Sequence, residues 1–227
     1  MSVAGGPDLI QDGLVLCLDA ANTKSYPGSG TSWVDLSRNG NNATLTNGPT
    51  FSSADGGHMV FDGTNDYAVV SNSSSLNMGN KSFTADVWLA VTSFSSAERM
   101  ILEYNVWGNS GTYQLTSYGN LIIINFVGTS QAGYTYTPFT TGVWLNFVGV
   151  FDNANNFRYI YINGSRLATA STTEEIASAV SSLYIGSRGG GSLFLPCKMS
   201  SIKMYNRALS DAEILQNYNA TKGRFRL

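Results

Sequence analysis

Residues 183–215, LYIGSRGGGSLFLPCKMSSIKMYNRALSDAEIL, carry the clearest structural signal in this chain. An apolar segment ends in Ile185-Gly186 and leads into a turn that contains three consecutive glycines. A second apolar segment then reaches Tyr205, and a short helical pattern follows it. The stretch therefore predicts a strand, a glycine-rich turn, a second strand and a closing helix.

The closing helix is predicted to begin after Ser210. Ser210 and Glu213 have the spacing of a capping box, in which each side chain hydrogen-bonds the backbone N–H of the other residue. Ile214, Leu215 and Tyr218 supply an apolar stripe at helical spacing. We expect the helix to stop at the following glycine, residue 223.

Strand signals recur at short intervals through the rest of the chain. In residues 83–89 the odd positions are apolar and are expected to face the core. Asn163-Gly164 is a strong hairpin signal, because both central residues of a type I′ turn need positive φ. Residues 173–180 are expected to be irregular. The strands are expected at 14–19, 59–62, 67–71, 82–91, 100–104, 113–117, 121–127, 143–151, 158–162, 165–170, 182–185 and 198–205.

Composition limits the classes of function. The 227 residues suit one large all-β domain, and 12% of them are charged, about half the usual share of roughly 25%. A formal net charge of -2 gives no long-range attraction for nucleic acid or anionic lipid. No apolar run approaches the roughly 20 residues of a membrane span, and the N-terminus lacks a secretory pattern. We therefore expect neither nucleic-acid nor membrane binding, and synthesis in a cytoplasm.

The two cysteines, Cys17 and Cys197, are too few for a disulfide scaffold. They could be neighbours if the first and last strands lie side by side. Two buried free thiols are favoured over a disulfide, and both possibilities stay open at this point. With one histidine, His58, the chain also lacks the three or four ligands of a zinc site.

The sequence predicts a protein that is not an enzyme. Glycoside hydrolysis needs two carboxylates that flank the scissile bond. Glu98 and Glu103 are five positions apart, so a regular strand would place them on opposite faces. Residues 174–175 are acidic but fall in an expected loop, and His58 has no nearby nucleophile motif. The three glycines at 189–191 open no helix and are a turn rather than a phosphate-binding loop.

Four segments, taken in order, resemble the laminin-G-like, concanavalin A-like lectin/glucanase jelly rolls. They are LVLCLDA with WVDLSRNGNNATL, MVFDGTNDYAVV, SFTADVWLAV with GVWLNFVGVFDNANNFRYIYINGSRLAT, and residues 183–215. The resemblance implies an all-β, two-sheet antiparallel jelly-roll sandwich with a short C-terminal helix, and it favours binding over catalysis. Arg38, Ala43 and Cys197 stand where such proteins often have glycine, and Ser200-Ser201 replace an acidic residue.

The opening and closing segments together also resemble stand-alone virion proteins of bacteriophages, of the cyanophage type. This resemblance implies a non-enzymatic structural protein, a capsid decoration or tail-associated protein made in the host cytoplasm without a signal peptide. Its implied partners are other virion proteins and surface glycans, and it implies a homo-oligomer. The alternative is a cellular carbohydrate-binding lectin module; a glycoside hydrolase or lyase is less favoured.

One jelly roll is expected to span residues 14–220. It follows an N-terminal arm, 1–13, and precedes a basic C-terminal tail, 221–227. Within it, the polar loop 25–45 exceeds about 12–15 residues, so it should be functional or packed down. We expect Trp33 in this loop to anchor it to the core, and the tryptophans at 88 and 144 also to pack inside.

A shallow aromatic site for sugars is predicted where loops meet at one rim. Sugars bind to aromatic faces and to amide hydrogen-bonding groups. Tyr104, Asn105 and Trp107 lie together at an expected strand end, and Tyr134 and Tyr136 lie in a glycine- and threonine-rich loop. Alternatively, the tyrosines cover the sheet and Trp107 anchors a loop.

A calcium site is a second possibility that the resemblance raises, because loop carboxylates hold Ca²⁺ in some such proteins. The candidate oxygen ligands are Asp35, Asn41, Asp62 and Asp66. Ca²⁺ takes about 6–8 oxygens. Asp62 and Asp66 lie in a turn that Asx hydrogen bonds could hold instead, and the serines at 200–201 replace one acidic candidate.

Overall fold

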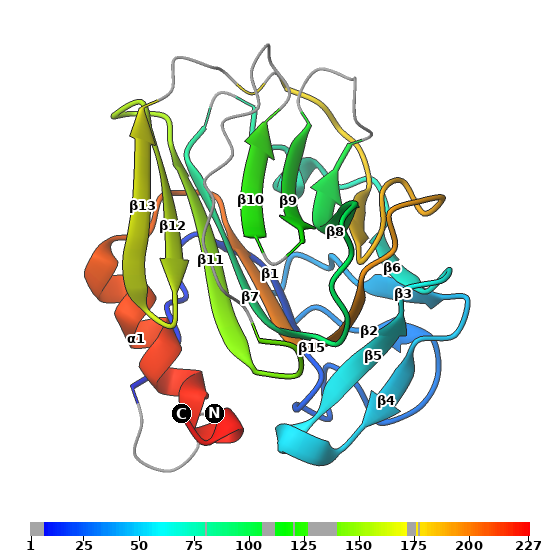
Figure 1. Ribbon diagram of the computed structural model, residues 1–227. Coiled ribbons are helices and arrows are strands. Elements are labelled where there is room, and N and C mark those ends of the chain that lie inside the picture. The colour runs from blue at the N-terminus through cyan, green and yellow to red at the C-terminus, as the bar shows by residue number, and fades with distance from the viewer. Residues whose placement is uncertain are drawn as a thin grey trace.

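The computed structural model describes residues 7–79, 81–105, 112–119, 121–126, 140–171, 176 and 178–227. In these residues the fold is an antiparallel two-sheet jelly-roll sandwich with one short C-terminal α-helix, as the sequence predicted (Figure 1). The sequence did not predict the strands that form within the expected loop 25–45, because these strands are only two to four residues long.

Sheet 1 has eight strands in the described part of the chain, in the order β13-β12-β11-β7-β15-β5-β4, with β1 paired to β15. Its central strands are the longest, and they are buried along most of their length. The bounds are β1 Leu14–Asp19, β4 Thr50–Ser52, β5 His58–Asp62, β7 Phe83–Val91, β11 Leu145–Asp152, β12 Phe157–Ile162, β13 Ser165–Ser171 and β15 Pro196–Tyr205.

Sheet 2 has seven strands among the same residues, in the order β10-β9-β8-β14-β6-β3-β2. Three short 3₁₀ helices and helix α1 complete the regular structure. The bounds are β2 Ser32–Trp33, β3 Ala43–Thr46, β6 Tyr67–Val70, β8 Glu98–Tyr104, β9 Tyr113–Tyr118, β10 Leu121–Phe126 and β14 Leu183–Ile185, with η1 Ala54–Gly56, η2 Ser74–Leu76, α1 Asp211–Thr221 and η3 Lys222–Phe225.

The glycine-rich turn after Ile185 carries the chain from one sheet to the other. Strand β14 pairs with β6 and β8 in sheet 2, whereas β15 pairs with β1, β5 and β7 in sheet 1. Gly190 has a φ of 74°, and a Cβ there would lie 2.9 Å from Cζ of Tyr67. Glycine is therefore required at this position both for its backbone angle and for the close approach.

The core lies between the sheets, and β7 shows how the sequence selects it. Phe83, Ala85, Val87 and Leu89 all belong to the main buried cluster, as the alternation of residues 83–89 predicted. Trp88 faces the other side of sheet 1 and is fully buried there. The tryptophans at 33 and 144 are buried too, which confirms their expected role in packing.

Helix α1 covers the outer face of sheet 1 (Figure 1). Its N-terminus is the predicted capping box, in which Ser210 accepts from the backbone N–H of Glu213 and Glu213 accepts from that of Ser210. The side chain of Trp88 donates to Oγ1 of Thr221 at the other end of the helix, at 2.8 Å. The helix therefore packs on the sheet along its whole length.

The residues after α1 also pack on sheet 1. Phe225 stacks on Trp88 with ring centroids 4.2 Å apart and contacts Trp144 at 4.6 Å. The guanidinium of Arg224 forms two hydrogen bonds with the carboxylate of Asp19, at 2.7 and 2.8 Å. Most of the expected basic tail is thus part of the folded body.

A sealed polar layer, Asp86, Asn146 and Lys203, lies on this same face of sheet 1. The ammonium of Lys203 is 3.3 Å from Oδ2 of Asp86, and both side chains are only 2% exposed. The amide of Asn146 donates to Oδ1 of Asp86 at 2.7 Å. Burial of two charges is tolerated here because they are paired and hydrogen-bonded.

Both cysteines are free and buried, as the sequence favoured. Cys17 in β1 lies opposite Lys203 of β15, whereas Cys197 is at the beginning of β15. Their separation along the strand excludes a disulfide without backbone movement. Burial raises the pKa of the Cys17 thiol to about 12 and raises that of Cys197 even more.

Candidate functional site

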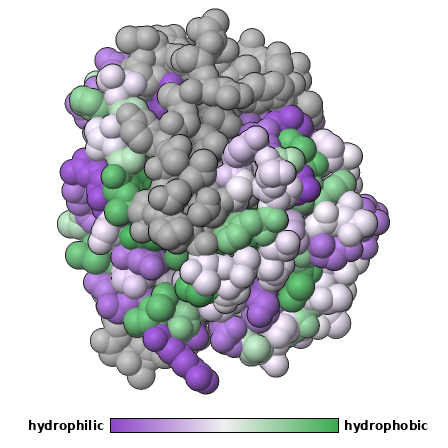
Figure 2. Space-filling view, viewed as in Figure 1, coloured by the Kyte–Doolittle hydropathy of each residue, from purple (hydrophilic) through white to green (hydrophobic). Residues whose placement is uncertain are grey.

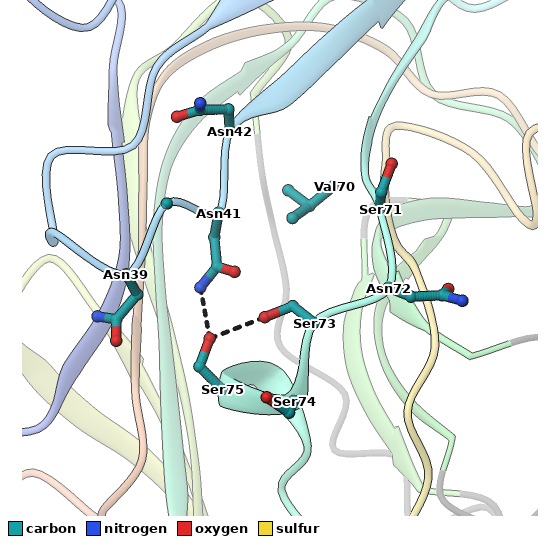
Figure 3. A pocket seen from close by; sticks show the side chains of 10 residues that line it. Asn39, Asn41, Asn42, Val70, Ser71, Asn72, Ser73, Ser74 and Ser75 are labelled. Atoms are coloured by element: carbon teal, nitrogen blue, oxygen red, sulfur yellow. Dashed lines mark hydrogen bonds between the residues drawn. The ribbon is translucent and has the colours of Figure 1, made fainter.

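A polar pocket of about 390 Å³ opens between two segments that flank sheet 2 (Figure 3). One segment precedes β3, and the other follows β6 and continues into η2. Carboxamides and hydroxyls supply most of the lining, and none of the lining side chains is charged. The lining residues are Asn39, Gly40, Asn41, Asn42, Val70, Ser71, Asn72, Ser73, Ser74 and Ser75.

Asp35 holds the first segment in place from behind the pocket. Its Oδ1 accepts from the backbone N–H groups of Cys17 and Ser37, at 2.8 and 2.9 Å. Its Oδ2 accepts from the hydroxyl of Ser37 at 2.7 Å and from the backbone N–H of Asn41 at 3.0 Å. The carboxylate thereby connects β1 to the loop, and it is only 8% exposed.

The loop turns sharply at Arg38, which has a φ of 73°. This left-handed conformation costs a residue with a Cβ about 1–2 kcal/mol. It explains why similar proteins often have glycine at this position. The hydrogen bonds of Asp35 offset the strain that arginine introduces here.

Asn41 is the best-fixed side chain in the pocket. Its Nδ2 donates to the carbonyl of Val15 and to the hydroxyl of Ser75, both at 2.7 Å. These two acceptors determine which end of the amide is nitrogen. The Oδ1 atom consequently points toward the gap between the two segments (Figure 3).

Two serine hydroxyls extend this arrangement. Oγ of Ser75 lies 2.8 Å from Oγ of Ser73, so a hydrogen-bonded chain runs from Asn41 through both hydroxyls (Figure 3). The side chain of Asn72 points away from the chain, and its Oδ1 accepts from Ser182 at 3.1 Å. The pocket therefore offers hydrogen-bonding groups to a polar ligand, and its lining has no histidine, lysine or carboxylate that could activate a serine as a nucleophile.

The sequence did not reveal this pocket as a site. Its signals are the runs NGNN at 39–42 and SNSSS at 71–75, which look like ordinary turn sequences. Only the pairing of Ala43 in β3 with Val70 in β6 brings the two runs together.

The predicted aromatic site is described only in part. Tyr104 is 1% exposed and stacks on Tyr113, with ring centroids 4.9 Å apart. Its hydroxyl donates to the carbonyl of Ala179 at 2.7 Å. In contrast to the prediction, this ring fills the space between the sheets and has no face for a sugar. Asn105 directly follows β8 with a φ of 61°, and Trp107, Tyr134 and Tyr136 lie outside the described residues.

The four predicted calcium ligands form two separate pairs. Asp35 and Asn41 hold the pocket loop, whereas Asp62 and Asp66 hold the turn between β5 and β6. The N–H of Thr64 donates to Oδ1 of Asp62 at 2.7 Å and lowers the pKa of that carboxyl. The oxygens of Asp62 and Asp66 accept backbone N–H groups within this turn, which is the alternative that the sequence left open for these two residues. The two pairs lie at opposite ends of the β3–β6 ladder, and no cluster of three or more His, Cys, Asp or Glu gathers among the described residues, so the four candidates do not form one site.

Glu98 and Glu103 lie on the same face of β8, which corrects the sequence expectation. A β-bulge falls between Met100 and Leu102 and inserts one extra residue. Arg188 contacts both carboxylates, at 2.7 Å from Glu98 and 3.8 Å from Glu103. The bulge thus produces an ion-paired cluster at a place where alternation predicted separation.

Two antiparallel sheets and a closing helix define a jelly-roll sandwich. The chain belongs to the concanavalin A-like lectin/glucanases superfamily, whose laminin-G family matches residues 62–215. The resemblance seen in the sequence motifs is confirmed at this level. A comparison with curated protein sequences found no match.

Solved structures show the same fold at low sequence identity. The binding domain of Paraclostridial Mosquitocidal Protein 1 is 17% identical, with a TM-score of 0.73 over 92% of this chain and 52% of that one. The binding domain of Botulinum neurotoxin DC, in complex with rat synaptotagmin II, is 15% identical, with a TM-score of 0.72 over 93% and 52%. Trypanosoma rangeli sialidase in its covalent intermediate is 17% identical, with a TM-score of 0.70 over 98% and 36%. The chain thus spans about half or less of these proteins, and the likeness shows the fold alone.

In the described part of the chain, no helix is long and apolar enough to cross a membrane.

Proposed function

We propose that this protein is a non-enzymatic binding domain that attaches to glycans through the polar pocket. The pocket carries the proposal: its amides and hydroxyls are fixed, uncharged and open to solvent. Such groups match the hydroxyls of sugars. On the described part of the face in Figure 2, hydrophobic residues are scattered among polar ones, which suits a polar ligand better than a large apolar partner.

We propose further that the domain is a structural protein of a bacteriophage particle, as a capsid decoration or tail-associated component. The support is the resemblance of its opening and closing segments to virion proteins. In this setting the partners are other virion proteins, and the protein is a homo-oligomer that displays the pocket outward. Structural neighbours that are binding domains of toxins are compatible with an adhesive role.

A glycan array tests the binding function. We expect the purified protein to bind a subset of glycans with millimolar to micromolar dissociation constants. Absence of binding to every glycan at millimolar concentration would refute the proposal.

Purified phage particles test the virion role separately. Mass spectrometry should find the protein in particles, electron microscopy should place it on head or tail, and light scattering should give a multiple of 24.3 kDa. A glycan-binding protein that is absent from particles would instead be the cellular lectin of the alternative hypothesis.

One observation favours the less expected hydrolase. Glu98 and Glu103 share a face of β8, as a catalytic pair must. Arg188 bridges them, however, and that contact suits a structural ion pair. Hydrolysis of any polysaccharide that is abolished by Glu103→Gln would establish catalysis; we expect no turnover.

A further inference from the structure

We infer that the polar pocket selects a neutral saccharide that presents two neighbouring hydroxyls, and that it rejects anionic sugars. The inference rests on the proposed glycan-binding function and names the ligand class of the same site. It follows from the orientation of one amide, the direction of one hydrogen-bonded chain, and the charge behind the pocket.

The first step is the orientation of Asn41. Both protons of its Nδ2 are used inside the protein, by the carbonyl of Val15 and the hydroxyl of Ser75. What the amide presents to a ligand is therefore its Oδ1, which can only accept. The side chain is 4% exposed, so it is held in this orientation before a ligand arrives. A ligand at this position must donate a hydrogen bond, as a sugar hydroxyl does and a carboxylate does not.

The second step is the pair of serine hydroxyls. Oγ of Ser75 accepts from Asn41 and lies 2.8 Å from Oγ of Ser73. When Ser75 donates onward, the proton of Ser73 is free to donate to a ligand. Such chains polarise one another and strengthen the terminal hydrogen bond. The site thus places one fixed acceptor beside one hydroxyl, which is the complement of two hydroxyls on adjacent carbons.

The third step is charge. The ten lining residues include no lysine, arginine or histidine to pair with a carboxylate. Behind them, the buried carboxylate of Asp35 accepts from the backbone N–H of Asn41 at 3.0 Å. An anion in the pocket would lose hydration and face this negative charge across a low-dielectric wall. A neutral sugar has no charge to desolvate and is not repelled by the carboxylate of Asp35.

The size of the pocket limits how much of a glycan it holds. Its volume of about 390 Å³ is near the lower end of the roughly 300–1,000 Å³ that small-molecule sites span. We therefore expect the end of a glycan, rather than a long internal stretch, to enter it.

Nuclear magnetic resonance titration of the full-length protein tests the inference. The probes are the methyl glycosides of glucose, galactose and mannose, and N-acetylneuraminic acid. We expect at least one neutral glycoside to shift backbone amide signals of residues 39–42 and 71–75, and N-acetylneuraminic acid to leave them unchanged.

A matched pair of variants assigns the binding to the pocket. Ser73→Ala removes the terminal hydroxyl and should raise the dissociation constant about fivefold, the value of one ordinary hydrogen bond. Ser53→Ala makes the same change at an exposed serine whose side chain caps nothing, and it should bind like the parent. Both variants should fold and melt within about 4 °C of the parent, because neither serine is buried and Ser73→Ala removes only one hydrogen bond.

The outcomes separate the inference from the proposed function. If glycans bind but both variants behave like the parent, or if N-acetylneuraminic acid shifts the pocket signals, the inference is overturned and the binding function stands. If no glycan on the array binds at all, both fail together.

Discussion

The sealed polar layer on sheet 1 and the polar pocket beside sheet 2 contain similar side chains but behave differently. In the sealed layer, Asp86 is paired with Lys203 and hydrogen-bonded by Asn146 under a cover of helix and aromatic rings. In the pocket, both protons of the Asn41 side-chain nitrogen are used in hydrogen bonds, and its oxygen points into the gap between the two segments. Polar composition alone therefore does not identify a site. What distinguishes the pocket is an accessible group with unused hydrogen-bonding capacity.

The largest effect should come from breaking the sealed layer. Asp86→Ala leaves the ammonium of Lys203 buried without a counter-ion, and we expect a loss of about 3–5 kcal/mol in the free energy of unfolding. Urea denaturation measures it. Asp12→Ala is the matched control, because Asp12 is 86% exposed in its ion pair with Arg207 and should cost under about 1 kcal/mol. Equal losses in the two variants would contradict a sealed layer.

The aromatic cover of that layer should come next. Phe225→Ala removes the ring between Trp88 and Trp144, and we expect a loss of about 3 kcal/mol with a change in tryptophan fluorescence. Phe157→Ala is the control, because Phe157 is 37% exposed. It should lower the free energy of unfolding by less than Phe225→Ala does. A Phe225→Ala protein as stable as the parent would show that residues 222–225 are a free tail after all.

The pocket side of the comparison depends on Asp35. Asp35→Asn replaces one carboxylate oxygen by an NH₂ group. The backbone N–H of either Ser37 or Asn41 then faces a donor and loses its hydrogen-bond partner. We expect a loss of about 1–3 kcal/mol, accompanied by weaker glycan binding. Asp62→Asn is a suitable control, because asparagine can hold the same exposed turn. If Asp35→Asn bound glycans as the parent does, the loop that Asp35 holds would not be needed for binding.

The smallest change in stability should follow from adding a calcium chelator. Because the oxygens of the three candidate aspartates accept backbone N–H groups, we expect a thermal melt that a chelator shifts by less than about 1 °C, against the roughly 2–4 °C that a 1 kcal/mol contribution gives in a chain of this size. The melt is recorded in added calcium and again after chelation. A drop of several degrees on chelation would restore the calcium site that the sequence suggested.

Local sequence signals predicted the parts of the fold that depend on neighbouring residues. The capping box of Ser210 and the alternation along β7 were both confirmed, because each is decided within one turn or one strand. The bulge after Met100 was not predictable from alternation, since it depends on pairing with β9. Tyr104 was proposed for a sugar site, yet its burial depends on the opposite sheet.

The pocket escaped prediction for a related reason. Its two polar runs are separated by residues 43–70, and either one alone is an ordinary turn. Their meeting requires the register of β3 with β6, and the orientation of the amide of Asn41 requires the carbonyl of Val15 in a third strand. Such a site becomes visible only when three separate strands are placed together.

The two buried thiols can report local opening of the folded protein. Alkylating reagents react with the thiolate, and the raised pKa and burial of Cys17 and Cys197 suppress that form while the protein is folded. Each thiol can be labelled only when its strand separates from the sheet. The rate of labelling under native conditions therefore reports how often sheet 1 opens at its first and last strands, without any engineered probe.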